Sequence, residues 1–134
     1  MTWILQNTFH HFSEKGLAEE DPRGSLTACQ AALIRDYLNE NLEAPIQLED
    51  LSELANLSRF HFLRKFKNTF GQTPHAYLTQ IRLGRAHSLL EKTDEKVMMI
   101  ALECGYTQHS QFTQAFKRHY GYPPATLRKR LGRH

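Results

Sequence analysis

Apolar positions along this chain recur every three or four residues and fall into short amphipathic segments. This spacing is typical of a helix that buries one face. Gly, Pro, Ser and Thr residues between the segments are common at helix starts and ends. The pattern predicts seven helices, at about 27–41, 48–55, 59–70, 74–92, 95–103, 108–120 and 124–130, and an N-terminal helix over 1–15. No segment alternates like a strand, so the sequence predicts an all-α fold.

The same pattern is written twice, from Leu48 to Pro74 and from Val97 to Pro124. Positions in the second half of each copy pair at an offset of 50, and positions before the turn pair at 49. A single extra residue therefore lies in the turn or at the start of the second helix, where a length change costs little. Each copy reads as a short helix, a tight turn and a longer helix with basic residues. Two such helix-turn-helix patterns predict a DNA-binding protein.

The turns and the connecting helix also contain residue types that are typical of these conformations. Asn56 in the first copy and Gly105 in the second both tolerate the left-handed conformation that a tight turn requires. A Thr-Pro pair starts the connecting helix in a favoured arrangement. Residues 74–92 span about 28 Å, close to the roughly 34 Å of one turn of B-DNA, and so can hold two recognition helices in phase. Gly84 within this helix costs about 1 kcal/mol relative to Ala, or marks a close packing contact.

Length and charge narrow the class of protein. The 134 residues are enough for one domain with its own core. No apolar run is long enough to cross a membrane, the N-terminus lacks signal-peptide features, and two cysteines without metal-ligand spacing suit a reduced, cytoplasmic protein. Residues 1–44 carry a balance of −4 and residues 45–134 a balance of +7. The repeated region is therefore the basic part, and a polyanion is its expected partner.

Other chemistries find little support in the sequence. The eight histidines lack zinc-type spacing, and no phosphate loop, nucleophile elbow or His-Glu-x-x-His motif is present. The sequence therefore predicts no metal, no cofactor and no enzymatic activity. Cys104 is expected to be a buried thiol rather than a redox centre. The serious rival is a helical protein-interaction module whose basic face docks an acidic partner, because charge alone does not separate it from a DNA-binding domain.

Residues 31–131 resemble the DNA-binding domain of the AraC/XylS family of bacterial transcription regulators. The matching positions in the linker and in the second copy are Gly71, Pro74, Tyr77, Leu78, Arg82, Leu83, Ala86, Leu89 and Leu90, and then Ile100, Ala101, Cys104, Gly105, Tyr106, Phe112, Phe116, Lys117, Gly121 and Pro124. The resemblance implies two homeodomain-like helix-turn-helix units, about 31–71 and 95–131, joined by a linker helix, 74–92, within a domain spanning 26–134. It also implies a sequence-specific regulator, an activator, that inserts two recognition helices into adjacent major-groove segments of promoter DNA.

Residues 1–25, an N-terminal helix and linker, lie outside the resemblance. They resemble the tail of a ligand-binding or dimerisation domain that precedes the DNA-binding part in many family members. Two alternatives stay open: a fragment whose effector or dimerisation domain is absent from this chain, and a stand-alone regulator. The family also implies a bacterial, cytoplasmic and nucleoid-associated protein, with RNA polymerase as a further partner.

Base contacts are expected on the exposed faces of the two recognition helices. The predicted base-contacting residues are Arg59, Phe60, Leu63 and Arg64 in the first helix and His109, Ser110, Gln111 and Gln114 in the second. The Arg64 fork matches O6 and N7 of guanine, and Gln114 favours adenine through N6 and N7. Phe60 and Leu63 either pack on thymine methyl groups or widen the core. Family members often carry a polar residue at Leu63 and Arg at Gln114, so these two positions depart from the family pattern.

Phosphate contacts are expected from basic side chains and from helix N-termini. The predicted phosphate-contacting residues are Ser58, Lys65, Lys67, Gln108, Thr113, Lys117, Arg118 and Arg128. Arg82 lies in an apolar stretch, so the sequence favours an internal ion pair or a helix-end bond over a DNA contact at this position.

Overall fold

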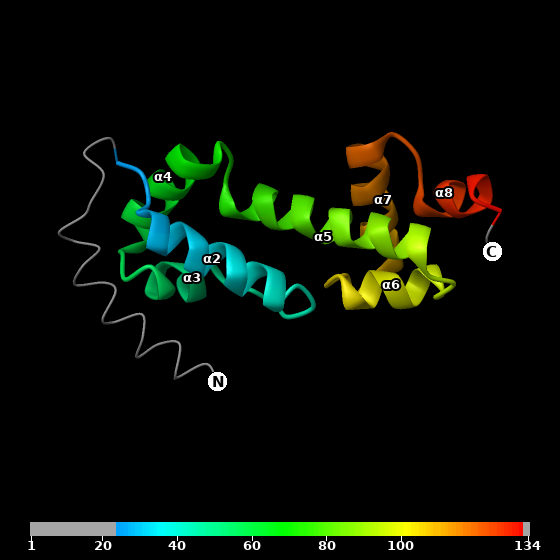
Figure 1. The fold of residues 1–134 in the computed structure, drawn as a ribbon, viewed down its shortest axis with the longest axis horizontal. Helices are drawn as coiled ribbons and strands as arrows, with labels where there is room; N and C mark the ends of the chain where they lie inside the picture. Colours follow the sequence, from blue (N-terminus) through cyan, green and yellow to red (C-terminus); the bar gives the residue numbers. More distant parts are fainter. Residues whose placement is uncertain (1–23, 133–134) are drawn as a thin grey trace. The chain divides into compact units, whose positions relative to one another are not determined.

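The computed structural model describes residues 24–132. Within these residues the protein contains seven α-helices and no strand (Figure 1). The helices are α2 (Ala28–Glu40), α3 (Leu48–Leu54), α4 (Arg59–Phe70), α5 (Pro74–Lys92), α6 (Val97–Glu103), α7 (His109–Tyr120) and α8 (Pro124–Arg130). The predicted all-α fold is confirmed, and the helix over 1–15 lies outside the described residues.

Helix ends in both copies use the residues that the sequence marks. The Ser58 hydroxyl caps α4 by accepting a hydrogen bond from the backbone N–H three residues on, at 3.2 Å. Gly71 and Gly121 end α4 and α7 in the left-handed conformation, with φ of 76° and 88°. The turns before these two helices also pass through positive φ, at Asn56 with 54° and at Gly105 with 91°. The predicted left-handed turn is therefore confirmed in both copies.

The described residues form two compact units, and the division does not follow the helices. The first unit contains residues 24–40 and Ile46–Tyr77, and the second contains Asn41–Pro45 and residues 78–132. α5 therefore begins in the first unit and continues into the second. In the sequence this helix reads as a connector, whereas in the structure most of it belongs to the second unit.

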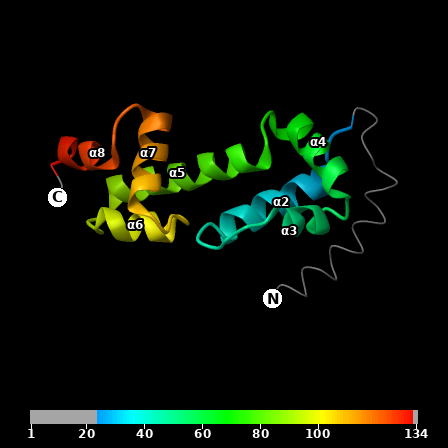
Figure 2. The same cartoon turned by 180° about the vertical axis from the view of Figure 1, so that it is seen from behind.

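The core of the first unit lies between α2, α3 and α4, and α3 packs against both of its neighbours (Figure 2). The largest fully buried side chains of this core are those of Ile34, Leu38, Phe62 and Phe66. The two phenylalanines lie one turn apart on α4, with ring centroids 5.6 Å apart. Burial of each ring contributes about 1.5–3 kcal/mol, so these rings determine which face of α4 points inward. The opposite face of α4 is left to solvent.

The second unit repeats this arrangement, with α6 and α7 packed against the later part of α5. Its buried cluster is Leu83, Ala86, Leu90, Ile100, Ala101, Cys104, Phe112, Phe116 and Leu127. Phe112 and Phe116 correspond to the phenylalanine pair of α4 and are also fully buried, with ring centroids 5.8 Å apart. Burial raises the pKa of the Cys104 thiol to about 11, so the thiol is protonated at neutral pH. The predicted buried thiol is confirmed.

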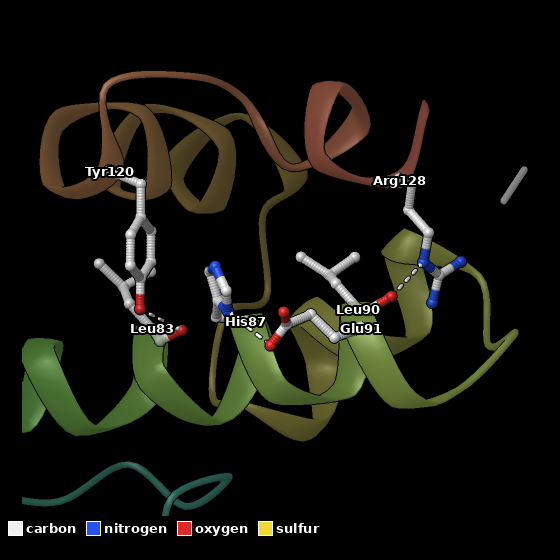
Figure 3. Close-up of polar contacts among 6 residues, drawn as sticks. All are labelled: Leu83, His87, Leu90, Glu91, Tyr120 and Arg128. Atoms are coloured by element: carbon white, nitrogen blue, oxygen red, sulfur yellow. Dashed lines mark hydrogen bonds and ion pairs between the residues drawn. The ribbon is translucent and has the colours of Figure 1, made fainter. Parts of the chain in front are cut away.

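Two polar side chains anchor α5 to the helices that follow it in the second unit (Figure 3). From α8, Arg128 Nε donates to the Leu90 carbonyl oxygen at 2.9 Å, and Arg128 Nη2 donates to the Thr93 carbonyl oxygen at 3.0 Å. From α7, the Tyr120 hydroxyl donates to the Leu83 carbonyl oxygen at 3.3 Å. These bonds satisfy carbonyl groups along α5 and hold the second helix-turn-helix against it.

Candidate nucleic-acid interface

α4 exposes one face opposite its buried phenylalanines. The exposed residues at this face are Ser58, Arg59, Phe60, Leu63, Arg64 and Lys67. Phe60 is 72% exposed and Leu63 is 38% exposed. The alternative in which these two residues widen the core is therefore wrong. Arg64 lies four residues after Phe60 and so on the same side of the helix, which places apolar surface and a guanidinium together.

The N-terminal end of α4 combines a capped turn with an ion pair. Ser58 Oγ lies 3.2 Å from the His61 backbone nitrogen and 2.8 Å from His61 Nδ1. The hydroxyl is thus engaged within the turn, and the first backbone N–H groups of the helix are left to bind an anion. Arg59 Nη1 lies 3.2 Å from a Glu49 carboxylate oxygen, with side chains 66% and 56% exposed. Such an exposed pair contributes at most about 1 kcal/mol, so Arg59 can exchange Glu49 for another anionic partner at little cost.

α7 exposes a face of different chemistry. The exposed residues of the predicted site on and before this helix are Gln108, His109, Ser110, Gln111, Gln114, Lys117 and Arg118. The two basic residues of this set lie in the last turn of the helix, and the remainder is polar. Amide side chains donate and accept hydrogen bonds at once, which matches the edges of bases. The face of α4 is therefore cationic and apolar, and the face of α7 is mainly a hydrogen-bonding surface.

The prediction that Lys65 and Thr113 contact phosphate is wrong. Lys65 is 4% exposed, because it lies three residues after the buried Phe62 and so on the inner side of α4. Thr113 directly follows the buried Phe112 in α7. Its hydroxyl oxygen is buried and has no hydrogen-bond partner among the residues that the structure describes. Neither polar group lies on the exposed face of its helix.

The prediction that Arg128 contacts phosphate is also wrong, for a different reason. The side chain is 2% exposed, and its guanidinium binds the Leu90 and Thr93 carbonyl groups at the C-terminal end of α5. A cation is favourable at this end of a helix, where the backbone dipole is negative. Arg128 therefore stabilises the scaffold of the second unit.

Arg82 makes the internal helix-end bond that the sequence favours. Its Nε donates to the Leu42 carbonyl oxygen and its Nη2 donates to the Ala44 carbonyl oxygen, both at 2.9 Å. Burial lowers the pKa of Arg82 from its ordinary value, although a guanidinium stays protonated in proteins. No sequence signal identified residues 41–45 as its partner, because a bond between residues 40 positions apart has no local pattern.

Residues 24–132 contain neither a metal-binding cluster nor a membrane-spanning helix. No group of three or more His, Cys, Asp or Glu side chains is arranged to hold a metal ion there. The same residues include no helix that is both long and apolar enough to cross a bilayer.

Two units that each contain a short helix, a left-handed turn and a longer exposed helix define a protein with paired helix-turn-helix motifs. A protein family described as a helix-turn-helix domain matches residues 51–130. Solved structures of AraC-type DNA-binding domains share the fold. The chain belongs to the AraC/XylS family of helix-turn-helix proteins.

Individual relatives agree with this assignment. An uncharacterized HTH-type transcriptional regulator of Haemophilus influenzae is 35% identical over 129 residues, covering 94% of this chain and 42% of the relative. The HTH-type transcriptional activator RhaS of Mannheimia succiniciproducens is 32% identical over 119 residues, covering 89% and 42%. The DNA-binding domain of AdpA, solved in complex with a target DNA, has 30% identity and a TM-score of 0.71, covering 74% of this chain and 89% of that one. The chain thus spans less than half the length of these two curated relatives.

Proposed function

We propose that this chain is a sequence-specific transcription regulator that binds double-stranded promoter DNA through α4 and α7. Each of these 12-residue helices buries two phenylalanines and exposes its opposite face. The major groove admits a helix and displays a distinct pattern of donors and acceptors for each base pair. The recurrence of one exposed helix face in each unit is the observation that carries the proposal. The likeness to the AdpA domain, which was solved with a target DNA, supports it.

α4 is proposed to recognise guanine and thymine. The Arg64 guanidinium can donate two parallel hydrogen bonds to O6 and N7 of one guanine. Phe60 and Leu63 offer exposed carbon surface that suits the C5-methyl group of thymine. Arg59, once released from Glu49, adds a second guanidinium at the start of the helix. The half-site of α4 is therefore expected to combine G with neighbouring T.

α7 is proposed to recognise adenine and to contribute less affinity than α4. Gln111 and Gln114 are exposed one turn apart, and each amide can bond N6 and N7 of an adenine. His109 and Ser110 add short hydrogen-bonding groups at the start of the helix. No arginine is among these base-contacting residues, so the charge-assisted bonds available to α4 are missing from this set.

Phosphate contacts are proposed for the exposed cations and for the helix starts beside the two faces. The residues that keep this role are Ser58, Lys67, Gln108, Lys117 and Arg118. Such contacts position the protein on the duplex without specifying sequence. The activity is thus one of binding rather than catalysis.

Selection of bound sequences from a random duplex library, with the full chain as bait, tests the proposal. A DNA regulator should enrich one motif of about two helical turns and favour it over scrambled duplexes by about 10³-fold or more. A basic module for an acidic protein partner should bind all duplexes alike, with an affinity that falls as salt rises. Equal retention of every duplex would reject the proposal.

The proposal extends to activation of transcription in the bacterial cytoplasm, at the nucleoid, with RNA polymerase as a partner. Purified polymerase and a promoter that carries the selected motif would test this part, since transcript yield should rise when the chain is added. An effector or dimerisation domain outside this chain and the domain bounds of 26–134 also stay predictions.

A further inference from the structure

The segment 41–45 has an unusual place in the molecule. It directly follows α2 and leads into α3, both of which belong to the first unit, yet its own contacts assign it to the second. The chain therefore passes from one unit to the other three times, after Glu40, before Ile46 and after Tyr77. Whatever holds the segment 41–45 in the second unit consequently restrains chain that belongs to the first.

Arg82 is the residue that holds this segment. Its planar fork binds two carbonyl groups at once, those of Leu42 and Ala44, at 2.9 Å each. A fork of this kind fixes direction as well as distance, which the single point charge of a lysine does not. Leu42 itself is 5% exposed, so its side chain is buried while its carbonyl group is bound. The segment is thus fixed through backbone and side chain together.

Gly105 packs against both Arg82 and the segment 41–45. A Cβ atom at Gly105 would overlap the Leu42 carbonyl oxygen and would lie 2.7 Å from Arg82 Nε. The turn of the second helix-turn-helix therefore packs directly on the bond between Arg82 and the segment 41–45. This turn immediately precedes α7, so the bound segment and the proposed DNA-reading helix share one support.

Arg82 differs from Arg128, a second arginine that binds two carbonyl groups. Arg128 binds the carbonyl groups of Leu90 and Thr93 by the same two nitrogens, at 2.9 and 3.0 Å. All of its partners lie in the second unit, and so does the whole of the chain around them. Arg128 therefore fastens one unit internally. Arg82 uses the same chemistry on a segment whose flanking helices belong to the other unit.

We propose that Arg82 is a positioning residue that couples DNA binding by α4 to DNA binding by α7. The inference rests on the proposed function. By holding the segment 41–45 against the turn at Gly105, Arg82 provides a second connection besides the continuous α5. A restrained second unit meets its half-site at a higher effective concentration once the first unit is bound, so a duplex with both half-sites is bound much more tightly than either alone.

The substitution Arg82→Gln in the full chain tests this coupling, with Arg85→Gln, an exposed arginine on the same helix, as matched control. Affinities are measured for a duplex with both half-sites and for duplexes in which one half-site is scrambled. The advantage of the double site should fall by about tenfold in Arg82→Gln and stay unchanged in the control. An unchanged advantage overturns the proposal, as does a single α7 half-site that weakens as much as the double site.

A measurement without DNA separates this inference from the proposed function. Cys29 is exposed and Cys104 is buried, so a spin label attaches at Cys29 and a second label at His119→Cys in α7. The distribution of distances between the labels should broaden in Arg82→Gln and not in Arg85→Gln. An unchanged distribution overturns the coupling even where the wild-type chain selects one DNA motif. A wild-type chain without any duplex preference overturns the proposed function and the coupling together.

The variant Arg82→Lys serves where Arg82→Gln fails to fold. It keeps the positive charge and loses the fork, so a fully folded Arg82→Lys chain should still show a reduced advantage of the double site. A normal advantage in that variant overturns the proposal.

Discussion

Residues on the two exposed faces differ in the functional groups at the ends of their side chains. Arg64 offers a fixed set of donors, Phe60 offers carbon surface, and Gln114 offers an amide that both donates and accepts. Each of these groups suits a different base, so substitution of each residue should change the base preference at a different position. The cations beside them, such as Lys67, should act on every sequence alike.

Arg64→Ala is expected to cost about 1–3 kcal/mol of binding and to relax the preference at one base pair, because the bidentate bond to guanine is lost. Anisotropy titrations with the selected duplex and with its three variants at that base pair measure both effects. Lys67→Ala is the control and should weaken all four duplexes equally. An equal loss on all four duplexes for Arg64→Ala as well would assign Arg64 to phosphate.

Phe60→Ala is expected to weaken binding by about 1–2 kcal/mol, because apolar area that thymine covers is lost. The free energy of unfolding should change by less than about 0.5 kcal/mol, since the side chain is 72% exposed. Deoxyuridine in place of thymidine removes only the methyl group and should cost the wild type about 0.8 kcal/mol at the contacted position. The same replacement should cost Phe60→Ala nothing, and a cost equal to that of the wild type would place the methyl contact elsewhere.

Most residues of the predicted site are exposed as expected, whereas the polar groups of Lys65, Thr113 and Arg128 are buried. Helical spacing from the buried phenylalanines separates inner from outer positions, but residues at the border between the two faces fall on either side. Lys65 and Thr113 are such border residues, each next to a buried phenylalanine in the sequence. Arg128 failed because its carbonyl partners lie 35 or more positions away, beyond the reach of any local pattern.

Helices were the most predictable elements, because caps and apolar spacing are local properties. α4 and α5 have the predicted bounds, and α6 begins two residues later than expected. The assignment of the segment 41–45 to the second unit was not predictable, since it depends on Arg82 and Gly105 far along the chain. Gly84 also departs from one expectation: a Cβ there would meet no atom within 4 Å, so it marks no close contact.

Two glycine substitutions should therefore have opposite effects on stability. Gly84→Ala is expected to stabilise by about 0.5–1 kcal/mol, because Ala favours a helix interior and space is available. Gly105→Ala is expected to destabilise by about 2–5 kcal/mol, since φ is 91° and the added atom meets Leu42 and Arg82. Urea unfolding at one pH measures both. A stable Gly105→Ala chain would contradict the packing described for this turn.

Charge is a property of the whole molecule. The chain carries a net +3, but residues 1–44 are acidic and the repeated region holds the excess of cations. Exposed cations attract the phosphate backbone and release counterions from it. The slope of log affinity against log salt therefore reports the number of phosphate contacts. The partly buried guanidinium of Arg82 and the buried guanidinium of Arg128 add to the net charge but bind carbonyl groups of the protein.

Lys117→Ala is expected to lower the slope of log affinity against log salt by about one, equally for all sequences. Titrations of the selected duplex at several salt concentrations give the slope. Arg128→Gln, measured on the folded chain, is the informative comparison, because removal of a buried charge that contacts no phosphate should leave the slope unchanged. A lower slope in that comparison would return Arg128 to the phosphate-binding residues.

The two left-handed turns also differ in how freely they can vary. At Asn56 the side chain is exposed, so any residue that accepts a positive φ fits there. At Gly105 the neighbouring atoms exclude even a methyl group. Saturation mutagenesis should therefore recover several functional residues at position 56 and glycine alone at position 105. The turn of the first copy therefore tolerates substitution, whereas Leu42 and Arg82 confine the turn of the second copy to glycine.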